Sequence, residues 1–232
     1  MALTAILLAS VIALSTAAAA TPAVAVPEGW QAFKINDKKK LTAYRLVEED
    51  GRPVLHAHAE ASASGVYQPG TFNLAERPIM SWSWKINRLI PGADNHKGGS
   101  EDSPARIVMV FEGDKEKLPT SDRTAMYLAR KLSGQELPYA TLMYIWSNDV
   151  PVGTVIPNPH TRRIQMVVAS TGAAGVGAWQ KLSRDVAADF RRAFKEEPGR
   201  LRAYGVMSDT DNTGKSVEAW YGEIQFASKK IP

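Results

Sequence analysis

The chain has 232 residues, 44% of them hydrophobic, and its 28 basic and 24 acidic side chains leave a net charge of +4. A chain of this length and composition can bury one substantial core. Its net charge is modest and its basic and acidic residues are interspersed, so it lacks the concentrated basic face that nucleic-acid binding normally needs. The chain has no cysteine, which excludes disulfides, thiolate metal sites and an anchor on an acylated cysteine. We therefore expect one domain, over residues 27–230, in a monomer that binds no nucleic acid.

The N-terminal 26 residues contain no charged side chain and pass from an apolar stretch into small residues that end in Ala23-Val24-Ala25. This pattern predicts a secretory signal peptide over residues 1–25 and hence a periplasmic or secreted protein. No Lys or Arg precedes the apolar stretch, so an uncleaved anchor is the alternative. Only in that case do we expect contact with a membrane.

Period-two segments recur along the rest of the chain between turn signals. They are residues 41–47, 53–59, 79–86, 105–111, 140–146, 163–169, 203–208 and 216–226. In residues 79–86 the alternation is strict, which places Trp82 and Trp84 in the apolar set, whereas residues 105–111 and 140–146 are apolar on both faces and should be central. The pattern predicts a mainly β protein, a jelly-roll-like antiparallel β-sandwich.

Two helices are predicted to cover this sandwich. One spans residues 121–132, and the other runs from about residue 183 to 195, where Pro198-Gly199 stops it. Apolar residues repeat every fourth position along the second: Leu182, Val186, Phe190 and Phe194. The glycine-rich residues 170–177 loosely resemble the nucleotide loop of short-chain dehydrogenases, but no alternating βα units surround them, which favours a strand-to-helix connection.

An acidic turn follows residue 208. Asp209-Thr210-Asp211-Asn212-Thr213-Gly214 matches the first half of an EF-hand loop, but position twelve is Trp220 and the flanks are strands, so an EF-hand is excluded. A hairpin whose side chains bond its own backbone is favoured, with Ca²⁺ held by Asp209 and Asp211 as the alternative. We expect no other cofactor.

Three further features are candidates for chemistry. Arg106 interrupts an apolar strand and needs an acceptor, for which Asp102, Asp185, Asp189 and Glu223 are candidates. An ion pair is favoured, and a guanidinium that waits for a ligand carboxylate is the alternative. Trp146, followed by Ser147-Asn148 at a strand end, is the best candidate for a ligand platform. His56, His58 and Glu60 share a strand face, but their spacing of nearly 7 Å favours a solvated face over a metal site.

The order of five motifs resembles a bacterial family catalogued as domain of unknown function 3047. The motifs are WSWKI, DSPARIVMVF, LMYIWSN, RDVAADFRRAF and SDTDNTGKSVEAWYGEIQF. The resemblance implies an exported protein of unassigned activity and supplies no catalytic residue. The family usually closes with Asp-Ile, whereas this chain has Glu223-Ile224. The ending also looks like that of jelly-roll carbohydrate-binding modules, which is analogy alone.

The function that we expect is non-catalytic binding of a saccharide or cell-envelope glycan. The residues assigned to it are Arg106, Trp146, Asn148, Asp209, Asp211 and Asn212. A polysaccharide hydrolase or lyase is the first alternative, since several carboxylates are available but chain order does not reveal which converge. A structural envelope protein is the second. A shared pocket of Arg106, Trp146 and the turn at residues 209–212 would support the binding function.

Overall fold

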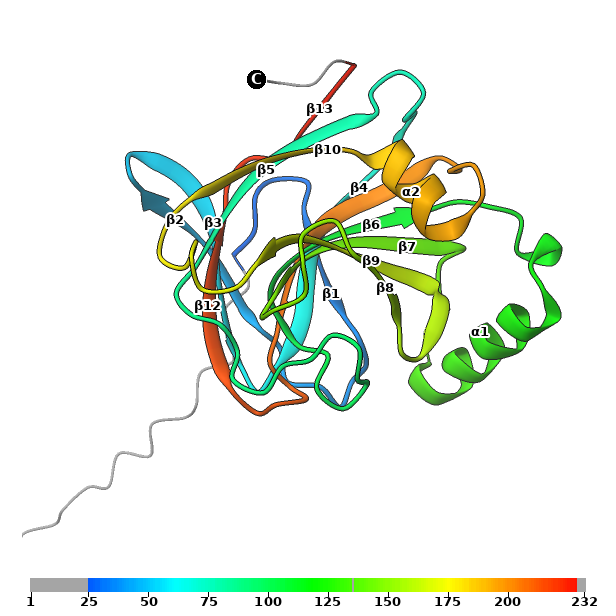
Figure 1. Cartoon of the computed structure of the whole chain (residues 1–232), viewed down its shortest axis with the longest axis horizontal. Coiled ribbons are helices and arrows are strands. Elements are labelled where there is room, and N and C mark those ends of the chain that lie inside the picture. The colour runs from blue at the N-terminus through cyan, green and yellow to red at the C-terminus, as the bar shows by residue number, and fades with distance from the viewer. Residues whose placement is uncertain (1–24, 135, 229–232) are drawn as a thin grey trace, which may run out of the picture.

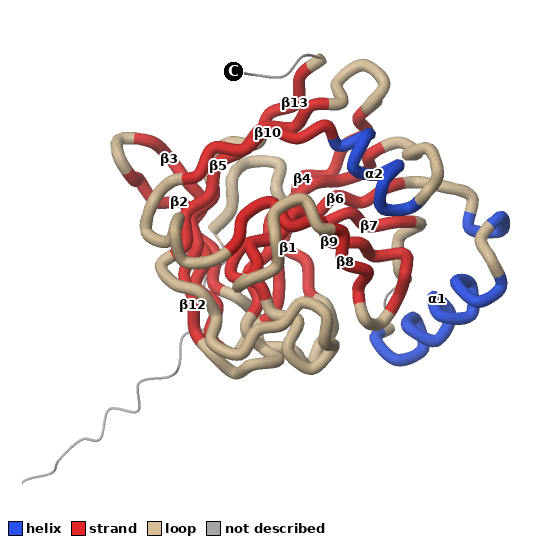
Figure 2. The backbone as a smooth tube through the Cα atoms, viewed as in Figure 1, coloured by secondary structure: helices blue, strands red, loops and turns tan. Residues whose placement is uncertain are grey.

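The computed structural model describes residues 25–134 and 136–228, which form two β-sheets packed face to face (Figure 1, Figure 2). The larger sheet contains, in spatial order, β1 (Gln31–Lys34), β4 (Ala63–Phe72), β11 (Leu201–Asp209), β6 (Ser103–Phe111), β7 (Ala140–Ser147), β9 (Thr161–Thr171) and β8 (Val155–Asn158). The smaller sheet contains β10 (Gln180–Asp185), β5 (Ile79–Ile86), β12 (Ser216–Tyr221), β3 (Arg52–Glu60) and β2 (Ala43–Glu49), and β13 (Gln225–Ala227) also pairs with β5. The predicted signal peptide lies outside the described residues except for Ala25.

The strand pairing confirms the predicted jelly-roll-like β-sandwich. Among the described strands every pairing is antiparallel except that of β7 with β9. Neighbours within a sheet come from distant parts of the chain: β11 lies between β4 and β6, and β12 lies between β3 and β5. The chain therefore passes repeatedly from one sheet to the other.

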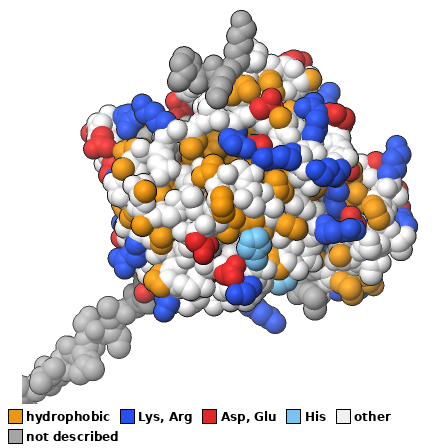
Figure 3. All heavy atoms as spheres, in the orientation of Figure 1, with side chains coloured by type: hydrophobic (Ala, Val, Ile, Leu, Met, Phe, Trp, Pro, Cys, Tyr) orange, Lys and Arg blue, Asp and Glu red, His pale blue; other side chains and the backbone are white. Residues whose placement is uncertain are grey.

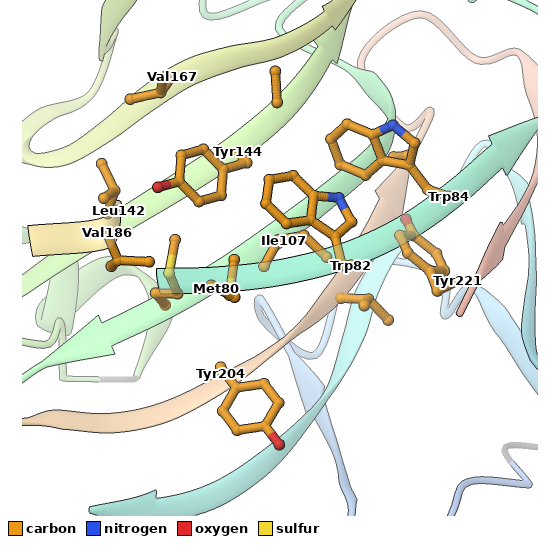
Figure 4. Packing of buried hydrophobic residues seen from close by; sticks show 14 of the residues in the cluster. Met80, Trp82, Trp84, Ile107, Leu142, Tyr144, Val167, Val186, Tyr204 and Tyr221 are labelled. Carbon is orange, nitrogen blue, oxygen red and sulfur yellow. The ribbon is translucent and has the colours of Figure 1, made fainter. Parts of the chain in front are cut away.

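The core between the sheets follows the predicted alternation. Met80, Trp82, Trp84 and Ile86 all point inward and are at most 3% exposed. The ring of Trp82 stacks on Tyr144 of the opposite sheet, with centroids 5.0 Å apart and an interplanar angle of 11° (Figure 4). Such aromatic pairs add to the free energy gained from burial alone.

The two helices lie at one side of the sandwich (Figure 1). They are α1 (Thr120–Ser133), preceded by the short 3₁₀ helix η1 (Lys115–Lys117), and α2 (Val186–Phe194). In α2, Phe190 packs on Phe111 of β6 with ring centroids 4.6 Å apart. No helix among the described residues is long and apolar enough to cross a membrane.

Three local predictions are wrong. The second helix begins only at Val186, where Asp185 caps it by accepting the Ala188 N–H at 2.8 Å, and residues 180–185 form β10 instead. The glycine-rich residues 170–177 consequently join two strands and lead to no helix. Residues 216–226 form two strands, because the chain leaves the sheet at Gly222 and rejoins it as β13.

Candidate functional site

Arg106 and Asp209 form a buried ion pair between β6 and β11. Arg106 is 2% and Asp209 3% exposed, and the guanidinium donates from Nε to Oδ1 at 2.8 Å and from Nη2 to Oδ2 at 3.0 Å. Burial raises the pKa of Asp209 to about 6, while the positive charge of Arg106 acts in the opposite direction. An ion pair was the favoured sequence prediction, but none of the four predicted acceptors is the partner that the structure gives to Arg106.

The turn after β11 is held by hydrogen bonds and an ion pair with residues outside it. Asp102 accepts the N–H groups of Asn212 at 3.2 Å and Thr213 at 2.7 Å, as well as the Thr213 hydroxyl at 2.6 Å. Asp211 forms an ion pair with Lys39. The predicted hairpin is therefore wrong: β11 and β12 belong to different sheets and do not pair, and the side chains that bond the turn come from Asp102 and Lys39, outside it.

The carboxylates of this cluster could face one ion. One oxygen each of Asp102, Asp209 and Asp211 lies within 4.8 Å of the others, a spacing that Ca²⁺ ligands can have. Each already has a protein partner, however, and a cation would compete with Arg106 and Lys39. Calcium binding therefore stays a prediction that the donor set does not favour.

Trp146 and Asn148 do not present a ligand platform. The Trp146 ring is fully buried, and its Nε1 donates to the Gly172 carbonyl at 3.1 Å. Asn148 donates from Nδ2 to the carbonyls of Ile90 at 2.7 Å and Ala93 at 3.1 Å. Both side chains hold loops in place, and the core hides the ring face that a ligand would need.

A large cavity lies elsewhere, at a split in the smaller sheet. β12 ends at Tyr221, whereas β3 runs on to Arg52 and β5 extends as far as Ile79. Residues 222–224 leave the sheet before β13 pairs with β5, and β13 does not pair with β3. A cavity of about 1390 Å³ lies at this split and extends in between the two sheets.

Aromatic rings and polar groups line this cavity together. The aromatic residues are Trp30, Trp82, Trp179, Tyr204 and Tyr221. The uncharged polar residues are Gln68, Ser81, Ser83, Ser183 and Gln225, and the charged residues are Arg52, Lys181 and Glu223. Figure 4 shows Trp82, Tyr204 and Tyr221 extending from three different strands, and Figure 3 shows one face of the molecule on which hydrophobic side chains reach the surface next to Lys and Arg side chains.

Several polar groups of the cavity are fixed by one another. The Tyr204 hydroxyl donates to Gln68 Oε1 at 2.5 Å, and Gln225 donates to Glu223 at 2.8 Å. Burial, reinforced by the negative charge of Glu223, raises the pKa of Tyr204, so its phenol stays neutral and able to donate. The buried Trp82 Nε1 has no hydrogen-bond partner among the described residues.

None of the six residues assigned from the sequence lines the cavity. The signal that could have located it is Gly222, which interrupts the period-two pattern at the point where the chain leaves the sheet. Its N–H donates to the Ser83 carbonyl at 2.9 Å, and a Cβ at this position would collide with Ser83 Oγ. A glycine in a strand pattern often marks such an irregularity.

Solved structures share the sandwich at very low sequence identity. A family 11 carbohydrate-binding module of the cellulase Lic26A-Cel5E from Clostridium thermocellum is 8% identical, with a TM-score of 0.43 over 88% of this chain and 90% of that one. A family 12 xyloglucanase from Bacillus licheniformis is 7% identical, with a TM-score of 0.44 over 83% and 88% of the two chains. Sequence identities and TM-scores this low support no inference about activity.

Sequence comparison gives the family directly. No curated protein matches the chain. A family model matches residues 28–225, nearly the whole described part, as the order of the five motifs predicts. The chain belongs to the family described as protein of unknown function (DUF3047).

Proposed function

We propose that this protein is an exported, non-catalytic binding module for a saccharide, with the cavity at the split of the smaller sheet as its binding site. The observation that carries the proposal is the lining of that cavity, which combines aromatic side chains, two of them partly exposed (Trp30 and Trp179) and three buried, with hydroxyl and amide groups. Sugars have apolar C–H faces that pack on aromatic rings and hydroxyls that need directed partners, and both are present here.

The distribution of carboxylates favours binding over hydrolysis. Glycoside hydrolysis normally uses two carboxyl groups on either side of the scissile bond. Among the described residues that line the cavity, Glu223 is the one acid, and Gln225 donates to it. The acidic cluster around Asp209 does not line the cavity and is paired with Arg106 and Lys39. A purely structural role, in turn, would not require an open cavity lined in this way.

Isothermal titration calorimetry with a panel of neutral and acidic oligosaccharides from cell envelopes and plant walls tests the proposal. Trp30→Ala removes an aromatic ring that packs edge-on against Tyr204, with centroids 6.0 Å apart. Tyr204→Phe removes the hydroxyl bonded to Gln68 while keeping the ring. We expect each variant to weaken binding by about tenfold, equivalent to about 1.4 kcal/mol.

The matched control is Asp211→Asn, which alters the acidic turn and leaves the cavity lining intact. It should bind like the wild type. Absence of binding to the whole panel at millimolar ligand would refute the proposal. If Asp211→Asn lost binding and Trp30→Ala did not, the binding site would lie at the acidic turn and not in the cavity.

A further inference from the structure

A row of four side chains crosses the outer face of the smaller sheet at right angles to its strands. In the strand register, Arg45 of β2 lies opposite His56 of β3, His56 opposite Trp220 of β12, and Trp220 opposite Lys85 of β5. The residues on either side of His56, Trp220 and Lys85 belong to the core, as does Tyr44 before Arg45, so these four side chains point away from it. None of them was assigned a ligand role from the sequence.

Trp179 extends this row by one position. The register of β10 with β5 pairs Gln180 with Trp84, which places Trp179 next to Lys85. The Lys85 Nζ lies 5.4 Å from the centroid of the Trp179 ring and 4.5 Å from that of Trp220. The ammonium is therefore held between two indoles, each within the range of a cation–π interaction.

His56 and Lys85 are held in place by their partners. His56 Nε2 lies 2.8 Å from Glu218 Oε2, and its ring centroid is 4.9 Å from that of Trp220. Lys85 forms an ion pair with Glu49, which lies three strands away at the end of β2. The β2–β3 hairpin must therefore bend over this face, so the side chains hold fixed positions before any ligand arrives.

The row is continuous with the cavity. Arg52 and Trp179 both line the cavity, and Arg52 Cζ lies 5.7 Å from the centroid of the Trp179 ring. Arg52 and Arg45 form no ion pair with a carboxylate of the described residues. Their guanidinium groups can donate to ligand hydroxyls or carboxylates.

Building on the proposed function, we propose that the cavity is one end of a longer binding face and that the ligand is an extended glycan chain of several linked sugars. Neighbouring strands are about 4.8 Å apart, so Trp179 and Trp220, two strands apart, are separated by about 10 Å. A single sugar in the cavity cannot also reach Trp220. A chain that leaves the cavity past Arg52 and Trp179 runs along the row, where the indoles can contact its C–H faces and the polar and charged groups can bind its hydroxyls.

The test is the dependence of affinity on chain length, measured by calorimetry with a series from disaccharide to hexasaccharide of one glycan that binds. In the wild type we expect affinity to rise by about tenfold or more along the series, equivalent to about 1.4 kcal/mol. Trp220→Ala should lower the affinity for the hexasaccharide to that for the disaccharide. Lys85→Met keeps the approximate length of the side chain and loses its charge. It should remove part of the gain in affinity, and it is the variant to use if Trp220→Ala does not fold. Asp211→Asn is the control and should retain the full gain.

The outcomes separate the two proposals. If the disaccharide binds and affinity does not rise with chain length, the extended face is refuted and the proposed function stands. The same holds if affinity rises but both Trp220→Ala and Lys85→Met keep the whole gain. If no member of any tested series binds, the proposed function itself fails.

Discussion

The buried pair of Arg106 and Asp209 allows a quantitative prediction about stability. Asp209→Asn keeps the shape of the side chain and removes its charge. The guanidinium, 2% exposed, then keeps at most one of its bonds of 2.8 and 3.0 Å, because the Asn amide has a single acceptor oxygen, and it stays buried without its bonded counter-charge. Removing one partner of a buried pair costs about 3–5 kcal/mol. At about 2–4 °C per kcal/mol for a domain of this size, the melting temperature should fall by about 6–20 °C.

Urea unfolding followed by tryptophan fluorescence measures this cost, and a double-mutant cycle isolates the pair. Arg106→Met alone should also destabilise, because it leaves the Asp209 carboxylate buried and unpaired. The double variant should lose clearly less than the sum of the two single losses, since no unpaired charge remains. Additive losses, or a cost below about 1 kcal/mol for Asp209→Asn, would refute this account of the pair.

Two further outcomes follow from the contacts of the core and of the turn. Trp84 Nε1 donates to Ser170 Oγ at 3.0 Å, whereas Trp82 Nε1 has no partner among the described residues. Trp84→Phe should therefore lower the free energy of unfolding by about 0.5–1.5 kcal/mol more than Trp82→Phe in the same urea assay, since one hydrogen bond is lost and Ser170 keeps its bond to Gln180. A Ca²⁺ ion would have to displace Lys39 from Asp211, so millimolar Ca²⁺ should leave the melting temperature unchanged in scanning fluorimetry. A Ca²⁺ site filled at a hundredfold excess over its Kd would instead raise the free energy of unfolding by about 2.7 kcal/mol.

The sandwich was predictable because side-chain direction along a strand is a local property. In residues 79–86 the alternation alone identifies the inward face, and the opposing sheet then covers it. β4 escaped prediction because it contains Gly65, Pro69 and Gly70, which are poor strand formers. Its place between β1 and β11 is set by tertiary pairing, which propensity does not encode.

The site was less predictable because it depends on distances between segments far apart in the chain. Trp146 stands at a strand end before polar residues, as a platform would, but the loop around Gly172 and the ring of Trp84 bury it. Arg106 was expected to find an acid, yet its partner Asp209 follows from the register of β11 with β6, which no short motif specifies.

The split in the smaller sheet connects the fold to the proposed function. Had β12 continued straight past Tyr221, it would have filled the space between β3 and β5 and closed the sandwich over Trp82 and Tyr204. The chain instead turns away at Gly222, which forgoes strand pairing there and leaves aromatic rings lining an open space. Protein interiors are otherwise close-packed, and an open space lined by rings and fixed polar groups is stabilised when a ligand fills it. A fold that leaves such a space open next to a pre-arranged row of charged and indole side chains has the form expected of a binding protein.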